Sequence, residues 1–326
     1  MWLGFDIGGT KLAVALGDAD GKLAARRRRP LAPSGDPRRD VDAMLRDARE
    51  LLAEAGVGAG ALEGVGIAAP GPIDASRGVV EHPPNLPGWE CVPLTAWFAD
   101  ALGVPAHLEN DANAAALAEW RFGAGQGARD LVYLTMSTGV GAGLVLDGRL
   151  YRGARGNAGE VGHVPVEWDG ERCGCGRRGC LEAYVGGRRW SERLARVTPA
   201  DGRVAALAGG VASVRPEHVL AAAREGDRFA CDELARWNDY LARGLVAICF
   251  TLAPEVIVLG TIAAAAGDAL CLEPLRQRVA ERVWPELVRG LEIRPAALGA
   301  DGAYYAALCS ALEASPDASA ASSPRS

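Results

Sequence analysis

The stretch Asp6-Ile7-Gly8-Gly9-Thr10-Lys11 joins two short apolar runs, residues 2–7 and 12–16, that are typical of β-strands. Two adjacent glycines let the backbone approach a ligand closely, and their amides and the Thr10 hydroxyl can donate hydrogen bonds to phosphate oxygens. Asp6, at the end of the first strand, can hold magnesium directly or through water. The stretch therefore predicts a phosphate-binding hairpin, although a tight turn without a ligand would show the same pattern.

A second glycine-rich turn, Ser137-Thr138-Gly139-Val140-Gly141-Ala142-Gly143, offers two hydroxyls and three glycines between two strand-like segments. Its Gly-x-Gly-x-Gly string is also found in dinucleotide-binding folds, but there it must open a helix, and here residues 144–146 continue as a strand. We therefore reject the Rossmann interpretation. Two phosphate turns on two α/β units instead predict a nucleotide held in a cleft between duplicated halves.

Strand-like and helical segments alternate along the chain, which is typical of the α/β class. A length of 326 residues corresponds to about two domains of ordinary size. Besides the strands around the two turns, we expect strands at 64–69, 104–108 and 256–259 and helices at 41–52, 111–120, 227–252, 270–283 and 304–314.

Charge and hydropathy exclude several classes of protein. The 35 Lys and Arg residues against 41 Asp and Glu residues give a net charge of -6, which argues against a nucleic-acid partner. The longest apolar runs, such as 245–253, are far shorter than the roughly 18 residues of a membrane span. With no export signal and five cysteines scattered through apolar segments, we expect a cytosolic protein without a membrane partner.

A polar triplet, Glu109-Asn110-Asp111, lies where an apolar strand gives way to an alanine-rich helix. Proteins of the α/β class place ligand-binding groups at such strand ends. A carboxylate there can serve as a general base, and Asp111 is the candidate to accept the proton of an attacking alcohol. The alternative is that Asp111 only caps the helix.

A cluster of soft ligands stands in the middle of the chain, with the spacing His-x9-Cys-x-Cys-x4-Cys. Intervening glycines allow the chain to fold tightly round one ion, and four such ligands suit tetrahedral zinc with no position left open for water. The cluster therefore predicts a structural zinc site made of His163, Cys173, Cys175 and Cys180. A Cys-x-Cys redox pair or chance clustering are the alternatives.

Two glutamates flank this cluster, Glu160 just before His163 and Glu182 just after Cys180. Zinc would clamp the ends of the loop together and bring the two carboxylates near each other. A metal-bound imidazole still has one N–H to donate, and carboxylates beside it can accept from vicinal hydroxyls. The arrangement predicts a sugar site, whereas each glutamate alone would be an ordinary surface charge.

Together these motifs resemble the ROK family (repressors, open reading frames, kinases), and within it the bacterial glucokinases. The resemblance is strong over residues 2–190 and weaker beyond them. It is carried by Asp6-Ile7-Gly8-Gly9-Thr10-Lys11, Ala69-Pro70-Gly71-Pro72, Asn85-Leu86-Pro87-Gly88-Trp89, Glu109-Asn110-Asp111-Ala112-Asn113, the turn at 137–143, and Gly159-Glu160-Val161-Gly162-His163 with its three cysteines.

The resemblance implies an α/β, actin-like ATPase (ribonuclease H-like) fold, in which two domains flank a cleft and close over a hexose. We expect a small domain of residues 1–112 plus about 300–314 and a large domain of residues 113–299. The Ser-, Ala- and Pro-rich tail at 315–326 is expected to be disordered. The family also suggests a homodimer or homotetramer.

The resemblance further implies ATP-dependent phosphorylation of the 6-hydroxyl of glucose, with Asp111 as the base. Sugar contacts are expected from Gly71, Asn85, Asn110, Asp111, Glu160, His163 and Glu182. Contacts to ATP and its Mg²⁺ are expected from Asp6, Gly8, Gly9, Thr10, Lys11, Thr138, Gly139 and Gly260. The family's zinc ligands match the four residues of the cluster.

Three alternatives accompany this interpretation. The family usually shows two or three glycines round the adenosine, whereas Gly260-Thr261-Ile262 has one, so polyphosphate or another nucleotide is the alternative donor. Fructose, mannose, allose or an N-acetylhexosamine are the alternative sugars, and the loop at 85–89 favours glucose unless Trp89 is merely a core residue. Sugar-responsive repressors of the family carry a DNA-binding domain before the first turn, and that turn begins here at residue 6.

Overall fold

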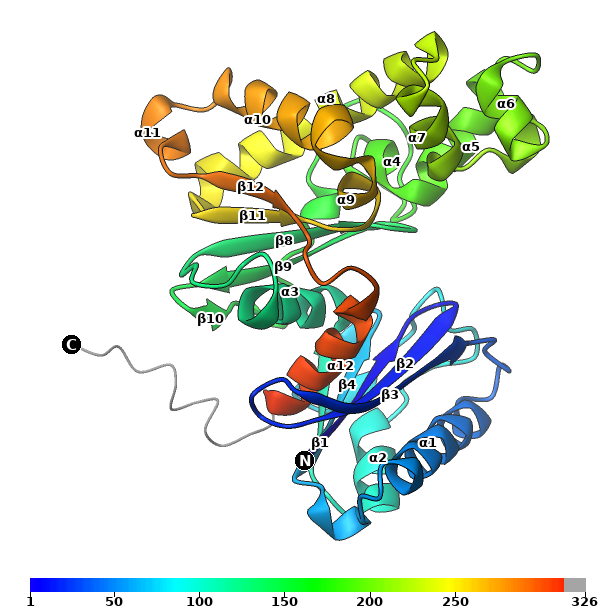
Figure 1. Cartoon of the computed structure of the whole chain (residues 1–326), viewed down its shortest axis with the longest axis vertical. Coiled ribbons are helices and arrows are strands. Elements are labelled where there is room, and N and C mark those ends of the chain that lie inside the picture. Colours follow the sequence, from blue (N-terminus) through cyan, green and yellow to red (C-terminus); the bar gives the residue numbers. More distant parts are fainter. Residues whose placement is uncertain (314–326) are drawn as a thin grey trace. The chain divides into compact units, whose positions relative to one another are not determined.

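The computed structural model describes residues 1–313, and the chain divides into two compact α/β units (Figure 1). Of the described residues, unit 1 contains Met1–Gln126, Gly148–Ala158 and 298–313, and unit 2 contains Gly127–Asp147 and Gly159–Ala297. The expected boundary at residue 112 would cut helix α3 (Asp111–Phe122), which instead lies whole in unit 1. The tail at 315–326 lies outside the described residues.

Unit 1 is built on a five-stranded sheet of order β3-β2-β1-β4-β7. Hairpin connections make β1, β2 and β3 antiparallel, whereas longer crossovers make β1, β4 and β7 parallel. The strands are β1 (Trp2–Ile7), β2 (Lys11–Gly17), β3 (Leu23–Pro30), β4 (Gly64–Ala69) and β7 (Ala106–Asn110). A separate small ladder pairs β5 (Ile73–Asp74) with β6 (Val79–Val80).

The two faces of this sheet are covered by different helices because side chains alternate along each strand. Leu3, Phe5 and Ile7 point into a buried core that also contains side chains of α1 (Pro37–Glu54) and α2 (Leu94–Leu102). On the opposite face lies α12 (Gly302–Leu312), drawn in red in Figure 1. A Cβ at Gly4 would come within 2.2 Å of the backbone of Ala307, so only glycine lets this helix approach so closely.

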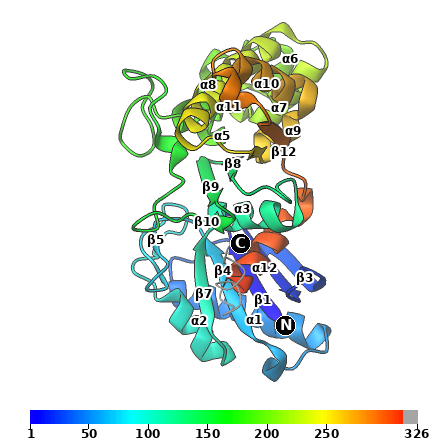
Figure 2. The same cartoon turned by 90° about the vertical axis from the view of Figure 1, so that its left-hand side faces the viewer.

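Unit 2 is built on four strands in the order β9-β8-β11-β12. These strands are β8 (Leu131–Met136), β9 (Val140–Leu146), β11 (Val256–Leu259) and β12 (Glu292–Pro295), whereas the short strand β10 (Arg149–Leu150), which pairs with β9, belongs to the chain segment of unit 1. Figures 1 and 2 show helices α7 to α10 gathered on one side of this sheet. The helices of the unit are α4 (Glu182–Val185), α5 (Gly187–Val197), α6 (Arg203–Ala208), α7 (Pro216–Arg224), α8 (Arg228–Leu252), α9 (Thr261–Gly267), α10 (Glu273–Ala280) and α11 (Pro285–Val288).

Most expected elements are present with altered ends, one is divided, and helices α2, α5, α6, α7 and α9 were not expected from the sequence. Helix α1 begins well before its first apolar residue, because Asp36 caps it and Pro37 starts it. The single helix expected at 270–283 is divided into a π-helical turn over Asp268–Leu272 and α10, with a proline in the first turn of α10. None of the helices within residues 1–313 is long and apolar enough to cross a membrane.

Candidate active site

The first glycine turn joins β1 to β2 as a tight hairpin. The Gly8 amide donates to the Lys11 carbonyl at 2.9 Å, while the side chains of Thr10 and Lys11 remain exposed. A Cβ at Gly9 would lie 3.0 Å from the Cβ of Asn85, so Asn85 packs directly against the turn. On unit 1 the fold therefore brings the turn that is expected to bind phosphate next to Asn85, which is expected to contact the sugar.

Asn85 belongs to a loop that Trp89 anchors in the core. The Trp89 side chain is 1% exposed, and its indole N–H donates to the Asp40 carboxylate at 3.1 Å. Asn85, four residues earlier, is exposed. Trp89 is thus a core residue, as the alternative interpretation held, and by fixing the loop it also presents Asn85 on the surface.

Asp6 and Asp111 lie near each other because β1, β4 and β7 run parallel and end at the same edge of the sheet. Burial of the Asp6 carboxyl and the negative charge of Asp111 raise the pKa of Asp6 to about 7, and the positive charge of Arg28 opposes this rise. Two carboxylates that repel each other in this way suit a cationic ligand between or beside them.

Asn110, and not Asp111, is the N-cap of helix α3. Its side-chain oxygen accepts from the amides of Ala112 and Asn113 at 2.9 and 3.2 Å. Asp111 is the first helical residue, and its carboxylate accepts from the Ala112 amide at 2.8 Å. The amide nitrogen of Asn110 lies 3.6 Å from the place where a Cβ of Gly71 would be, which brings these two expected sugar contacts together.

The second glycine turn, on unit 2, is held by a carboxylate. One Glu182 oxygen, Oε2, accepts from the Val140 amide at 3.0 Å, and a Cβ at Gly139 would come within 2.4 Å of that same oxygen. The start of α5 also binds the turn, since the Gly187 amide donates to Ser137 and the Arg188 amide to Thr138. Arg188 was not predicted from the sequence, because the contact depends on how α5 packs.

A cavity of about 720 Å³ opens beside this turn, entirely within unit 2. Thr138, Arg188, Arg215, Thr261 and Ile262 are among its lining residues. Thr138 therefore lies where the second glycine turn meets a space large enough for a nucleoside.

The short glycine motif after β11 forms one wall of the same cavity. Gly260 leaves room for the Tyr133 hydroxyl, which would lie 2.5 Å from a Cβ there. Thr261 has φ of 48°, a left-handed conformation that favours glycine, and its hydroxyl accepts from the Met136 amide at 2.8 Å. Thr261 thus has the backbone conformation that a second glycine after Gly260 would adopt easily.

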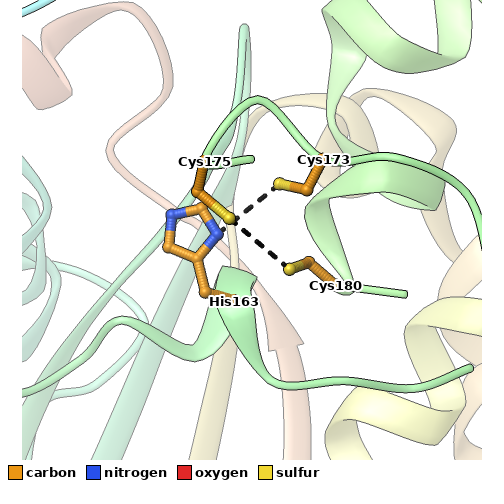
Figure 3. A group of neighbouring side chains, drawn as sticks. All are labelled: His163, Cys173, Cys175 and Cys180. Carbon is orange, nitrogen blue, oxygen red and sulfur yellow. Dashed lines mark hydrogen bonds between the residues drawn. The ribbon is translucent and has the colours of Figure 1, made fainter. Parts of the chain in front are cut away.

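His163, Cys173, Cys175 and Cys180 converge as the sequence predicts, with their ligand atoms all within 4.8 Å of one another (Figure 3). The Sγ atoms of Cys175 and Cys180 are 3.7 Å apart, and Cys173 Sγ is 3.7 Å from His163 Nδ1. Burial raises the pKa of the Cys173 thiol to about 12, so its proton would be displaced only by a strongly bound cation. The group is a candidate metal centre.

The two flanking glutamates occupy different sides of this centre. Glu160 Oε2 lies 3.9 Å from Nε2 of His163, the ring nitrogen that faces away from the cysteines. Glu182 Oε1 lies 3.5 Å from Cys173 Sγ, while its other oxygen holds the second turn. Glu182 therefore links the turn to the metal centre, a role that its position in the sequence did not indicate.

Solved structures of known proteins match nearly the whole chain, including both units. The chain is similar to the ROK hexokinase of Thermus thermophilus, at 34% identity and a TM-score of 0.79 over 95% of this chain and 97% of that one. A ROK glucokinase of Streptomyces griseus in complex with glucose and AMPPNP is similar at 33% identity and a TM-score of 0.78, over 94% and 97% of the two chains. The protein has the actin-like ATPase fold.

The sequence comparisons agree. The ROK family model matches residues 2–313, so the chain belongs to the ROK family. The glucokinase of Thermotoga maritima is 39% identical over 295 residues, which cover 89% of this chain and 90% of the relative.

The raised pKa of Asp6 predicts a pH-dependent stability effect. Because this pKa lies above the ordinary value of 3.8, the folded protein binds more protons than the unfolded chain between pH 3.8 and about 7, and stability falls as the pH rises through that window. Asp6→Asn removes the cost of the buried charge. In the absence of ligands and Mg²⁺, we expect the variant to have a higher Tm than the wild type by a few °C at about pH 8, and by less at about pH 5.

Differential scanning calorimetry at the two pH values measures this difference. Asp20→Asn, at an exposed aspartate in the turn between β2 and β3, is the control and should leave Tm unchanged. A Tm for Asp6→Asn that is unchanged at about pH 8 would contradict the electrostatic description.

Proposed function

We propose that the protein is a glucokinase that transfers the terminal phosphoryl group of ATP to the 6-hydroxyl of glucose. The observation that carries the proposal is the pair of carboxylates at the strand ends of unit 1, Asp6 and Asp111, beside a glycine turn built for phosphate. Relatives named glucokinase, one of them solved with glucose and AMPPNP, support this choice of substrates.

Asp111 is the proposed general base. Its place at the first residue of α3, after a strand end, fixes its backbone, and Asn110 rather than Asp111 is the N-cap of the helix. In this role the Asp111 carboxylate accepts the proton of the sugar hydroxyl as the oxygen attacks the phosphorus. The proposed sugar contacts of unit 1 are Asn85, which packs against the first glycine turn, and Asn110 and Gly71, which lie close to each other.

Asp6 and the two turns are proposed to hold the phosphates. The turn of Gly8, Gly9, Thr10 and Lys11 on unit 1, which the bond from the Gly8 amide to the Lys11 carbonyl closes, and Thr138 and Gly139 on unit 2 offer further amides, hydroxyls and one ammonium group. When bound near Asp6, Mg²⁺ would neutralise charge on the transferred phosphoryl group. The cavity beside Thr138 and Gly260 is the proposed site of the adenosine.

We propose Zn²⁺ as the ion of the four-residue centre. Tetrahedral zinc with thiolate ligands has sulfur atoms about 3.8 Å apart, close to the 3.7 Å between Cys175 and Cys180. The centre would fix Nδ1 of His163 and leave its Nε2 near Glu160, so that both can contact a sugar hydroxyl. The same proposal places the reaction in the cytosol, where ATP and reduced thiols are both present.

A panel of hexoses tests the function directly. Glucose, fructose, mannose, allose and N-acetylmannosamine are each offered with ATP and with polyphosphate, and formation of ADP and of the sugar phosphate is followed. We expect the highest kcat/KM for glucose with ATP. A higher kcat/KM for another sugar, or for polyphosphate, would replace glucose or ATP in the proposal, and no phosphorylation of any hexose would refute it.

Removal of the proposed base should slow catalysis with little effect on binding. Asp111→Asn keeps the size of the side chain, and we expect kcat to fall by about 10²- to 10⁴-fold while the glucose Kd changes by less than about threefold. Asp100→Asn, at an exposed aspartate on α2, is the matched control and should retain wild-type kcat. Retention of more than a tenth of the activity by Asp111→Asn would exclude the base assignment.

Loss of one thiol should release the ion and weaken glucose binding together. For Cys175→Ala we expect zinc well below the roughly one ion per chain of the wild type, together with a higher glucose KM. Cys231→Ala, at another exposed cysteine of unit 2, should change neither. Zinc content is measured by atomic absorption, and a wild type purified without chelators that contains no zinc would disprove the assignment of the ion.

A further inference from the structure

Four consecutive arginines, Arg26 to Arg29, lie on the edge strand β3, and their side chains alternate between the two faces of the sheet. Arg27 and Arg29 point toward α1, where Arg27 binds Glu54 at 2.6 Å and Arg29 binds Asp47 at 2.6 Å. Arg26 and Arg28 point to the opposite face.

Arg26 is engaged on this opposite face by the start of α12. Its guanidinium binds Asp301 at 2.6 Å and lies over the ring of Tyr304, 5.2 Å from the ring centre. Arg28 is exposed, and among residues 1–313 its side chain has no hydrogen-bond or ion-pair partner. Of the four arginines, Arg28 is therefore the one whose guanidinium the fold leaves available to a ligand.

The strand register places Arg28 on the same face of the sheet as Asp6, two strands away. Arg28 is paired with Ala13 of β2, and Ala13 is paired with Asp6 of β1, so the three side chains form one row on one face. Ala13, between Arg28 and Asp6, carries only a methyl group. Lys11, two residues before Ala13 on the same strand, points to the same face next to the first glycine turn.

This row combines the guanidinium of Arg28 with the carboxylate of Asp6 next to the first glycine turn, and Asp111 lies near Asp6. An arginine placed there only to neutralise Asp6 would form a direct ion pair with it, and Arg28 does not. A guanidinium donates two parallel hydrogen bonds to a phosphate group, which no other exposed side chain of the row can do.

We propose that Arg28 binds the terminal phosphates of the phosphoryl donor at the first glycine turn, as a further substrate-binding residue on unit 1. The inference rests on the proposed function, since it assigns the donor to this turn. A cation at this position also counters the repulsion that Asp6 and Asp111 exert on a polyanionic donor.

Kinetics of three variants test the proposal. For Arg28→Ala we expect the KM for ATP to rise by about tenfold or more, as for the loss of a charge-assisted hydrogen bond, with the glucose KM within about threefold of wild type. Arg28→Lys keeps the charge and should recover part of the loss. Arg26→Ala removes the neighbouring arginine of the same face and should leave the KM for ATP unchanged.

Direct binding separates this inference from the proposed function. Isothermal titration calorimetry with tripolyphosphate and Mg²⁺ should show tighter binding to the wild type than to Arg28→Ala, whether or not glucose is the substrate. If the wild type phosphorylates no hexose but this difference is found, the function is wrong and the phosphate site stands. Equal affinity of wild type and Arg28→Ala for both ATP and tripolyphosphate, with matching circular dichroism spectra, would overturn the inference.

Discussion

Parallel pairing of β1, β4 and β7 is the constraint on which the chemistry of unit 1 depends. The pairing register places Asp6 beside Ala68 and Ala68 beside Glu109, so the ends of the outer two strands meet at one edge of the sheet. Asp6 and Asp111 are thereby forced near each other, and their repulsion together with burial raises the pKa of Asp6. The folded protein bears this electrostatic cost in its ligand-free state, which is common where a site is built for a cation or for proton transfer.

In unit 2, one carboxylate connects two features that are far apart in the sequence. Glu182 holds the Val140 amide of the second turn with one oxygen and approaches the Cys173 thiol with the other. The shape of the turn and the packing of the metal-binding loop therefore depend on each other. Glu182 is therefore the side chain that joins the candidate metal centre to the second glycine turn.

The metal centre and both turns could be predicted from the sequence because their residues are close along the chain. Cys173, Cys175 and Cys180 lie within eight residues of one another, and the resemblance of such motifs to the ROK family implied the actin-like fold. The residue that caps helix α3 was harder to predict from the sequence. Asn110 and Asp111 are both good capping residues, and the choice between them depends on where β7 ends.

The sequence by itself determined the local chemistry: which segments turn, which residues can donate or accept a proton, and which thiols can share an ion. Tertiary structure alone decided which of these groups meet. Arg28 is one of four identical neighbours, and only the register of β3, β2 and β1 places it in the row of Asp6. Register has this power because side chains alternate along a strand, so that a shift of one residue would move Arg28 to the face of α1.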